Sequence, residues 1–211
     1  MFSTFLRSML RQPALVSSVH LLRFFNNKTG VVIGGRLRWH FRALVRTARK
    51  IVNVDNCPSN VTELGNVDYV TDATDLFFAP DETLDFVCSS HVLEHIANPL
   101  RAIGEWKRVV RDRGIIYAGV PDKRYTFDHV RDRTPLSHLV DDFNGDVDQT
   151  DKTHVDELLD KVRNKPRSQI HHHVWIVDDV AEVFEHMGLP VIYGPVLHHG
   201  TTHIIGQKSK R

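Results

Sequence analysis

Glycine and aspartate residues stand at the ends of two short β-branched runs in the first half of this sequence. Gly34 and Gly35 follow residues 31–33, and Asp55 ends residues 51–55. Glycines let a ligand approach the backbone closely, and the N–H groups that open a following helix attract polar or anionic groups. Asp55 comes 20 residues after Gly35, a spacing that allows a carboxylate to accept both hydroxyls of a ribose.

A further carboxylate, Asp72, follows a third short run at residues 68–71 and precedes Ala73. An Asp side chain accepts N–H groups such as the exocyclic amine of an adenine, and a small neighbour leaves room for the ring. Each Asp is also compatible with a helix cap or a turn. In combination with the two glycines, the two carboxylates indicate a pocket for an adenine and a ribose.

The elements that must position these residues follow an alternating pattern. From Thr29 onward, short β-branched runs alternate with amphipathic helical stretches, which is typical of a parallel sheet covered by helices. Ligands of such open sheets bind outside the carboxyl ends of the strands, so the glycines and aspartates are expected at one edge. The predicted strands are residues 31–33, 51–55, 68–71, 84–88 and 114–120, and the predicted helices are residues 37–50 and 99–110.

The end of the chain predicts a different kind of pairing. A helix is expected to begin near Asp178 and to end at Gly188, and two strands follow at residues 191–197 and 202–207. Their short connection contains Gly200 and predicts an antiparallel hairpin. The predicted fold class is therefore α/β, a Rossmann-like, open, mostly parallel sheet with helices on both faces and a C-terminal antiparallel β-hairpin.

Charge is distributed unevenly along the chain. The first 54 residues hold ten Lys or Arg and no acid, and the remainder holds 17 basic against 26 acidic residues. We divide the chain into a basic amphipathic segment at residues 1–28 and a domain at residues 29–211, with an insertion at about residues 121–170. The basic segment could contact an anionic membrane surface, a nucleic acid or a targeting receptor, or form the solvated face of two helices. Nucleic acid is not the expected partner, because no nucleic-acid motif accompanies the charge.

Cysteine content and the first residues bear on location. Only Cys57 and Cys88 are present, which excludes a disulfide framework and a four-thiolate zinc site and favours a reduced, cytoplasmic setting. No apolar run reaches the roughly 20 residues that span a bilayer. Residues 2–9 place Phe, Leu and Met on one helical face beside Arg7 and Arg11. An organelle presequence and a membrane-peripheral helix are therefore alternatives to a helix packed on the domain.

The stretch from residue 84 to residue 121 carries an ordered set of motifs. A hydrophobic strand with an acid near its start is followed by the turn Ser-x-x-Leu-Glu-His at residues 90–95, a helix with basic residues, and a Gly-led strand that ends at Pro121. This order resembles the class I S-adenosylmethionine-dependent methyltransferase family, in particular its small bacterial domains. The resemblance extends over residues 29–208, with the insertion only loosely matched.

The resemblance implies S-adenosylmethionine as the cofactor and methyl transfer as the reaction. The acceptor is expected to be a small molecule or a glycan or lipid-linked precursor, with the insertion supplying specificity. A nicotinamide-dependent reductase is disfavoured by the terminal hairpin and by the missing Gly-x-Gly-x-x-Gly motif. If the acceptor is a hydroxyl, His91, His95 or Asp122 could take its proton. The cofactor pocket is implied to be lined by Gly34, Gly35, Asp55, Asn56, Asp72, Ala73, Ser90 and His91.

The first glycine motif departs from the family pattern. Where the family has an acid and further glycines, this chain has Val32, Arg36 and Leu37. A cationic sulfonium is held less tightly beside extra arginines unless a carboxylate such as Glu94 compensates. The alternative function is therefore a catalytically inactive methyltransferase-like module that binds a partner.

Histidines gather late in the sequence, at His171, His172 and His173 and again at residues 198–203. Imidazole is a common metal ligand, but alternation along a strand would turn His172 away from its two neighbours. The resemblance implies instead that residues 172–175 border the acceptor pocket. No metal site is expected.

Overall fold

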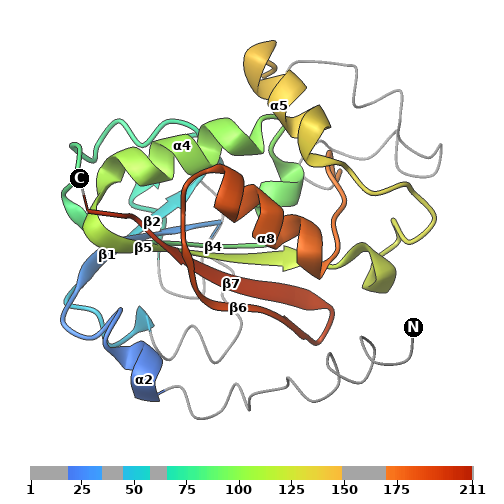
Figure 1. Ribbon diagram of the computed structural model, residues 1–211. Coiled ribbons are helices and arrows are strands. Elements are labelled where there is room, and N and C mark those ends of the chain that lie inside the picture. Colours follow the sequence, from blue (N-terminus) through green and yellow to red (C-terminus); the bar gives the residue numbers. More distant parts are fainter. Residues whose placement is uncertain (1–18, 35–44, 58–65, 149–169, 211) are drawn as a thin grey trace.

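The structure, a computed structural model, describes residues 19–34, 45–57, 66–148 and 170–210 (Figure 1). Gly35, most of the predicted helix at residues 37–50 and part of the insertion fall outside the described residues. The described elements are, in chain order, α2 (Val19–Leu22), β1 (Thr29–Ile33), β2 (Lys50–Asp55), β3 (Tyr69–Val70), β4 (Leu84–Ser90), η1 (Leu93–His95), α4 (Pro99–Val109), β5 (Val110–Pro121), η2 (Lys123–Tyr125), α5 (Leu136–Asn144), α8 (Val177–His186), β6 (Val191–His198) and β7 (Thr201–Gln207).

The described strands form one sheet in the order β3-β2-β1-β4-β5-β7-β6. Strand β1 pairs in parallel with β2 and β4, and β4 pairs in parallel with β5, whereas β7 runs antiparallel to both β5 and β6. The predicted fold class is thereby confirmed, including the terminal hairpin. The strand order reverses between β1 and β4, and open sheets of this kind bind ligands outside the carboxyl ends of the strands at such a reversal.

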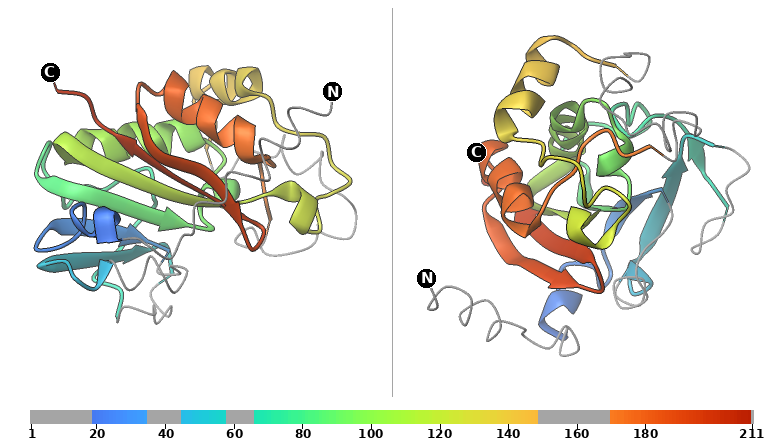
Figure 2. Two further views of the ribbon diagram at one scale, coloured as in Figure 1. Left: turned by 60° about the horizontal axis from the view of Figure 1, so that its bottom comes forward. Right: turned by 90° about the vertical axis from the view of Figure 1, so that its right-hand side faces the viewer.

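Helices cover both faces of the sheet (Figures 1 and 2). Helices α4 and α8 lie on one face, where the larger core contains Trp106 and Phe184, and α2 lies on the opposite face. On that opposite face, Leu21 and Phe25 belong to a second core, and the Phe25 ring meets the Phe86 ring edge-on with 5.2 Å between centroids. Residues that precede β1 therefore pack against the face of the sheet opposite to α4 and α8.

The local sequence explains where α4 begins and what it supports. The Asn98 side chain accepts a hydrogen bond from the Arg101 backbone N–H at 3.0 Å, and Pro99 occupies the first turn, where its missing N–H costs nothing. The buried side of the helix includes Trp106, whose indole N–H donates to the carbonyl oxygen of Ala73 at 2.9 Å. Helix α4 therefore anchors the loop that follows β3.

Most strands extend slightly beyond their predicted bounds, and β5 extends the furthest. Strand β4 continues to Ser90, and β5 begins at Val110 instead of residue 114. The early start of β5 depends on a register shift in its pairing with β4 and on Arg113, whose φ is 59°. Such a bulge lets a strand continue through a segment that lacks strict alternation, so sequence periodicity does not reveal it.

Helix α8 follows its predicted pattern closely. It begins one residue before the expected start, and Gly188, with a φ of 63°, follows its last turn as a left-handed stop. Val180, Val183 and Phe184 form its buried side. Among the described residues, no helix is long and apolar enough to cross a membrane.

Lys208, near the end of the described residues, forms hydrogen bonds with the C-terminal end of α4. The Lys208 ammonium donates to the carbonyl oxygens of Val110 and Lys107, each at 2.8 Å, and pairs with Glu82 at 3.1 Å. Replacing Lys208 by Met leaves these buried acceptors without their donor, so we expect a loss of about 2 kcal/mol in the free energy of unfolding. Urea denaturation measures this loss. The exposed Lys210→Met is the matched control, and an equal effect of both substitutions would contradict the interpretation.

Candidate functional site

Gly34 ends β1 in a conformation that favours glycine. Its φ is 74°, and its N–H donates to the carbonyl oxygen of Val54 at 2.8 Å. A Cβ atom at this position would lie only 2.4 Å from Cγ2 of Val92, which comes from the turn after β4. Both the left-handed backbone and the close contact therefore favour glycine here. The position is the predicted one, at the reversal point between β1 and β4.

We expect Gly34→Ala to lower the free energy of unfolding by about 1–3 kcal/mol, because the new methyl group adds an overlap to a strained φ. Urea denaturation gives the loss. The double variant Gly34→Ala/Val92→Ala removes the Cγ2 atom that the new methyl group would strike. It should recover the part of the loss due to overlap, while the backbone part persists. No recovery in the double variant would show that the contact with Val92 is unimportant.

Asp55 lies at the carboxyl end of β2, beside the end of β1, as predicted. Its side chain is buried, and Oδ1 accepts a hydrogen bond from the Cys57 N–H at 3.0 Å. Its backbone carbonyl accepts from Thr71 at 3.1 Å, which ties the end of β2 to the β3 segment. The next residue, Asn56, is exposed. These contacts fix the Asp55 carboxylate at the carboxyl edge of the sheet, close to the point where the strand order reverses.

Asp72 and Ala73 form the turn that follows β3. Asp72 Oδ1 accepts hydrogen bonds from the Thr74 N–H at 2.9 Å and from the Thr74 hydroxyl at 2.7 Å, so the carboxylate does serve as a turn residue. Ala73 is buried, and its carbonyl oxygen is the acceptor for Trp106. The conformation of this turn is therefore fixed by hydrogen bonds inside the turn and by the hydrogen bond from Trp106 of α4.

Ser90 and His91 complete the edge at the end of β4. Ser90 is 1% exposed, and its hydroxyl has no hydrogen-bond partner among the described residues. His91 has a φ of 57°, donates its N–H to the carbonyl of Gly119 at 2.8 Å, and forms a side-chain hydrogen bond with Thr201 at 3.0 Å. A buried hydroxyl without a protein partner is uncommon in native structures and is suited to a polar ligand group.

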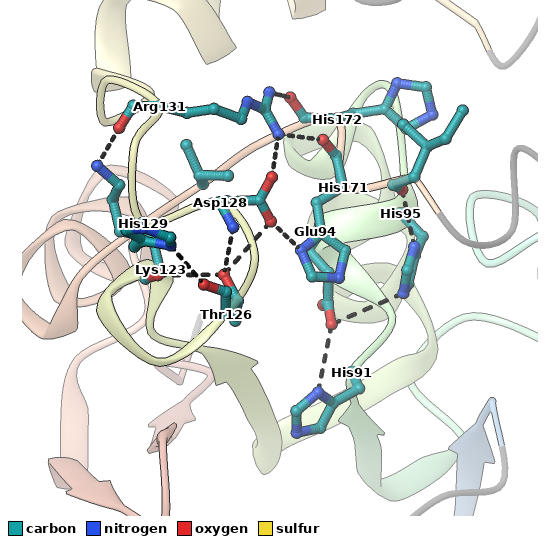
Figure 3. A network of polar contacts seen from close by, with 12 residues as sticks. His91, Glu94, His95, Lys123, Thr126, Asp128, His129, Arg131, His171 and His172 are labelled. Atoms are coloured by element: carbon teal, nitrogen blue, oxygen red, sulfur yellow. Dashed lines mark hydrogen bonds and ion pairs between the residues drawn. The ribbon is translucent and has the colours of Figure 1, made fainter. Parts of the chain in front are cut away.

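Beyond His91 lies a network that the sequence analysis did not predict (Figure 3). Glu94 is 1% exposed, and its Oε1 lies 3.5 Å from Nδ1 of His91 and 3.8 Å from Nε2 of His95. Burial raises the pKa of Glu94 to about 8. His95, a possible base in the sequence analysis, is bonded to the backbone: its Nδ1 lies 2.8 Å from the carbonyl oxygen of Ile170.

The insertion supplies the other half of the network. Asp128 accepts a hydrogen bond from Nδ1 of His171 at 2.6 Å and another from Arg131 at 3.0 Å. Burial alone would raise the pKa of Asp128, but these two hydrogen bonds outweigh it and lower that pKa. Arg131 also donates to the carbonyl oxygens of His171 and His172. The only sequence signal for this pairing is the i,i+3 spacing of Asp128 and Arg131, which many solvated segments share.

Three other residues that the sequence analysis considered are held in an ion pair or in a core. Asp122 is fully buried and accepts from Arg124 Nε at 2.8 Å and Nη2 at 2.6 Å, so it forms an ion pair instead of facing an acceptor. Trp175, from the segment expected to border the acceptor pocket, is buried in the larger core. Val32, at the position where the family has an acid, lies in the second core. Arg36 and Leu37 fall outside the described residues.

Comparisons with known proteins agree with this architecture. Residues 32–118 match the family model described as a methyltransferase domain. No curated protein matches the chain in sequence. The Aquifex aeolicus S-adenosylmethionine-dependent methyltransferase has 15% identity and a TM-score of 0.51, and the match covers 94% of this chain and 95% of that one.

Two further structures are similar in fold. A proposed S-adenosylmethionine-dependent methyltransferase from Listeria monocytogenes has 17% identity and a TM-score of 0.56, with 93% of this chain and 98% of that chain covered. A proposed methyltransferase of Haloferax volcanii, in complex with a methyltransferase activator, has 16% identity and a TM-score of 0.56, with 97% and 88% covered. Identities at this level show the fold alone. The family match over residues 32–118 and these neighbours together support a class I S-adenosylmethionine-dependent methyltransferase domain with S-adenosylmethionine as its cofactor.

Proposed function

We propose that this chain transfers the methyl group of S-adenosylmethionine to a small molecule or to a glycan or lipid-linked precursor. The observation that carries the proposal is Gly34, whose left-handed φ and contact with Val92 favour a residue without a side chain at the reversal point of the sheet. When bound, the cofactor supplies an electrophilic methyl group. The residues of the chain must bind the cofactor and align the acceptor, since alignment is the main requirement of such a transfer.

The donor set at the carboxyl edge is suited to this cofactor. In the proposal, Asp55 accepts the ribose hydroxyls, and Asp72 accepts the adenine amine beside the small Ala73. The backbone at Gly34 is proposed to lie against the amino acid part, and Asn56 to extend the wall next to Asp55. Gly35, which falls outside the described residues, is expected beside Gly34 from the sequence alone. The buried Ser90 hydroxyl, which has no partner among the described residues, and the neighbouring His91 complete the far wall.

The acceptor is proposed to lie against the insertion. The segment that contains Asp128 and Arg131 binds His171 and His172, and the His172 N–H donates to the carbonyl oxygen of Glu94, in the turn after β4, at 2.7 Å. The insertion and the cofactor edge therefore share one polar network. By the sequence resemblance, residues 172–175 are expected to border the acceptor pocket. His172, His173 and Trp175 are all buried, so little of their side chains faces solvent. Exposed parts of His91 and His95 are better placed to meet an acceptor.

The alternative is a methyltransferase-like module that binds a partner without catalysis. One observation favours this alternative. Val32 occupies the position where the family has an acid, and it is fully buried in an apolar core. A cationic sulfonium would then lack one source of electrostatic stabilisation.

One experiment separates the two functions. The full chain is incubated with S-adenosylmethionine and either a polar metabolite extract or a lipid extract, and S-adenosylhomocysteine formation is measured. The proposal expects formation that depends on one extract and falls sharply in Asp55→Ala. Folded protein that forms no product with either extract, yet retains a partner from them, would support the binding module.

A further inference from the structure

A cluster of potential metal ligands lies next to the cofactor edge. Glu94, His95 and His171 each direct one ligand atom toward the others, and these atoms all lie within 4.8 Å of one another. Glu94 and His95 come from η1, directly after β4, and His171 comes from the far end of the insertion. Figure 3 shows the second nitrogen of the His171 ring facing the Glu94 carboxylate.

Hydrogen bonds fix both imidazoles in the form that binds metals. Nδ1 of His95 contacts the carbonyl oxygen of Ile170 at 2.8 Å, and a carbonyl can only accept, so this nitrogen carries the proton. Nδ1 of His171 likewise meets the Asp128 carboxylate at 2.6 Å. In the neutral rings, Nε2 is then left with its lone pair. A carboxylate or carbonyl behind each histidine is the arrangement that supports metal-bound histidines.

The Glu94 carboxylate is a second and independent observation. It is 1% exposed, and neither of its oxygens has a hydrogen-bond partner among the described residues. Burial of a carboxylate without hydrogen bonds is costly, and such groups are normally paired or coordinate a metal. The Glu94 carboxylate faces two imidazoles, as a metal ligand would, and binding of the cofactor does not call for this arrangement.

We propose that Glu94, His95 and His171 bind a divalent transition-metal cation of the Zn²⁺ type. Two imidazoles and one carboxylate favour such a cation over Mg²⁺ or Ca²⁺, which prefer oxygen ligands, and three protein ligands leave a position for water or an acceptor oxygen. Ligand atoms about 2.0–2.1 Å from a tetrahedral metal lie roughly 3.3 Å apart, so the three side chains would move inward slightly on binding.

This proposal revises the sequence expectation that no metal is bound. That expectation assumed that residues 171–173 alternate along a strand, but the segment is not a strand in the structure. Of the three histidines, only His171 joins this cluster, and His173 lies in another with His138 and Asp142. In that second cluster the His173 nitrogen that faces Asp142 is Nε2, 3.8 Å from Oδ2, and the same nitrogen contacts the carbonyl oxygen of Ala97 at 3.1 Å and therefore carries a proton, which makes this the poorer metal site.

The test is calorimetric titration of the full chain with Zn²⁺ after removal of metal by a chelator, supported by the visible spectrum with Co²⁺. We expect one site of high affinity and a ligand-field spectrum typical of a four-coordinate N/O site. Glu94→Gln keeps the side-chain shape and should abolish the Co²⁺ bands. Asp128→Asn, behind His171, should weaken Zn²⁺ binding by about 10- to 100-fold.

His138→Gln is the matched control, because it removes an imidazole from the second cluster and should leave Zn²⁺ affinity and the Co²⁺ spectrum unchanged. Circular dichroism of each metal-free variant verifies folding. The proposal is overturned if wild-type protein shows no stoichiometric binding, or if folded Glu94→Gln binds Zn²⁺ as tightly as the wild type. A loss of binding in His138→Gln with unchanged binding in Glu94→Gln would also overturn it, since the metal would then belong to the second cluster.

Discussion

Substitution of Asp55 by Ala is expected to weaken the binding of S-adenosylhomocysteine by about 100-fold. Hydrogen bonds to a charged group contribute roughly 1.5–3 kcal/mol, and each 1.4 kcal/mol changes an affinity tenfold. Asp55 is held at the carboxyl end of β2 by its own contacts with Cys57 and Thr71. The carboxylate is therefore preorganised for the two ribose hydroxyls. Calorimetric titration of the variant measures the loss.

Controls distinguish this effect from general destabilisation. Asp55→Asn keeps one acceptor oxygen without the charge and should lose about tenfold. Asp81, by contrast, has an exposed side chain paired with Arg108 at the surface, so Asp81→Ala should leave the affinity unchanged. If Asp55→Ala remains folded and binds S-adenosylhomocysteine as the wild type does, the assignment of the ribose site is wrong.

The largest effect on stability is expected at Trp106. Its side chain is fully buried in the larger core, and Trp106→Ala should cost about 3–5 kcal/mol through lost burial and the cavity that remains. For a chain of this length, the melting temperature should fall by about 10 °C. Differential scanning calorimetry measures the change.

Trp106→Phe separates packing from the hydrogen bond to Ala73. The smaller ring retains most of the apolar contacts but cannot donate, so about 1–2 kcal/mol should be lost. Because the same hydrogen bond fixes the turn that contains Asp72, cofactor affinity should also decline by several fold. Equal melting temperatures of the Phe variant and the wild type would show that the indole donor contributes nothing to the turn.

Most of the scaffold follows from local sequence signals. Strands β1 and β2 are short β-branched runs, and Asn98 and Gly188 limit their helices through capping interactions that involve only neighbouring residues. The positions of Gly34 and Asp55 at one edge follow because parallel strands align their carboxyl ends. These features could be predicted since each depends on periodicity or on a few consecutive residues.

The polar network could not be predicted in the same way. The contact between Asp128 and His171 joins residues 43 positions apart, and its existence depends on the path of the insertion rather than on a pattern within it. Residues 171–173, for which the sequence analysis considered alternation along a strand, do not form one, and the segment contacts η1 and Arg131 instead. Glu94 was considered only as a counter-charge for the cofactor, and its burial became evident only from the fold.

The most direct test of the account is a crystal structure of the full chain with S-adenosylhomocysteine. The account predicts that the ligand lies at the carboxyl ends of β1, β2 and β4, with its ribose hydroxyls within hydrogen-bond distance of Asp55 and its adenine beside Ala73. A ligand found away from Gly34 and Asp55, or folded protein that takes up no ligand at saturating concentration, would contradict it.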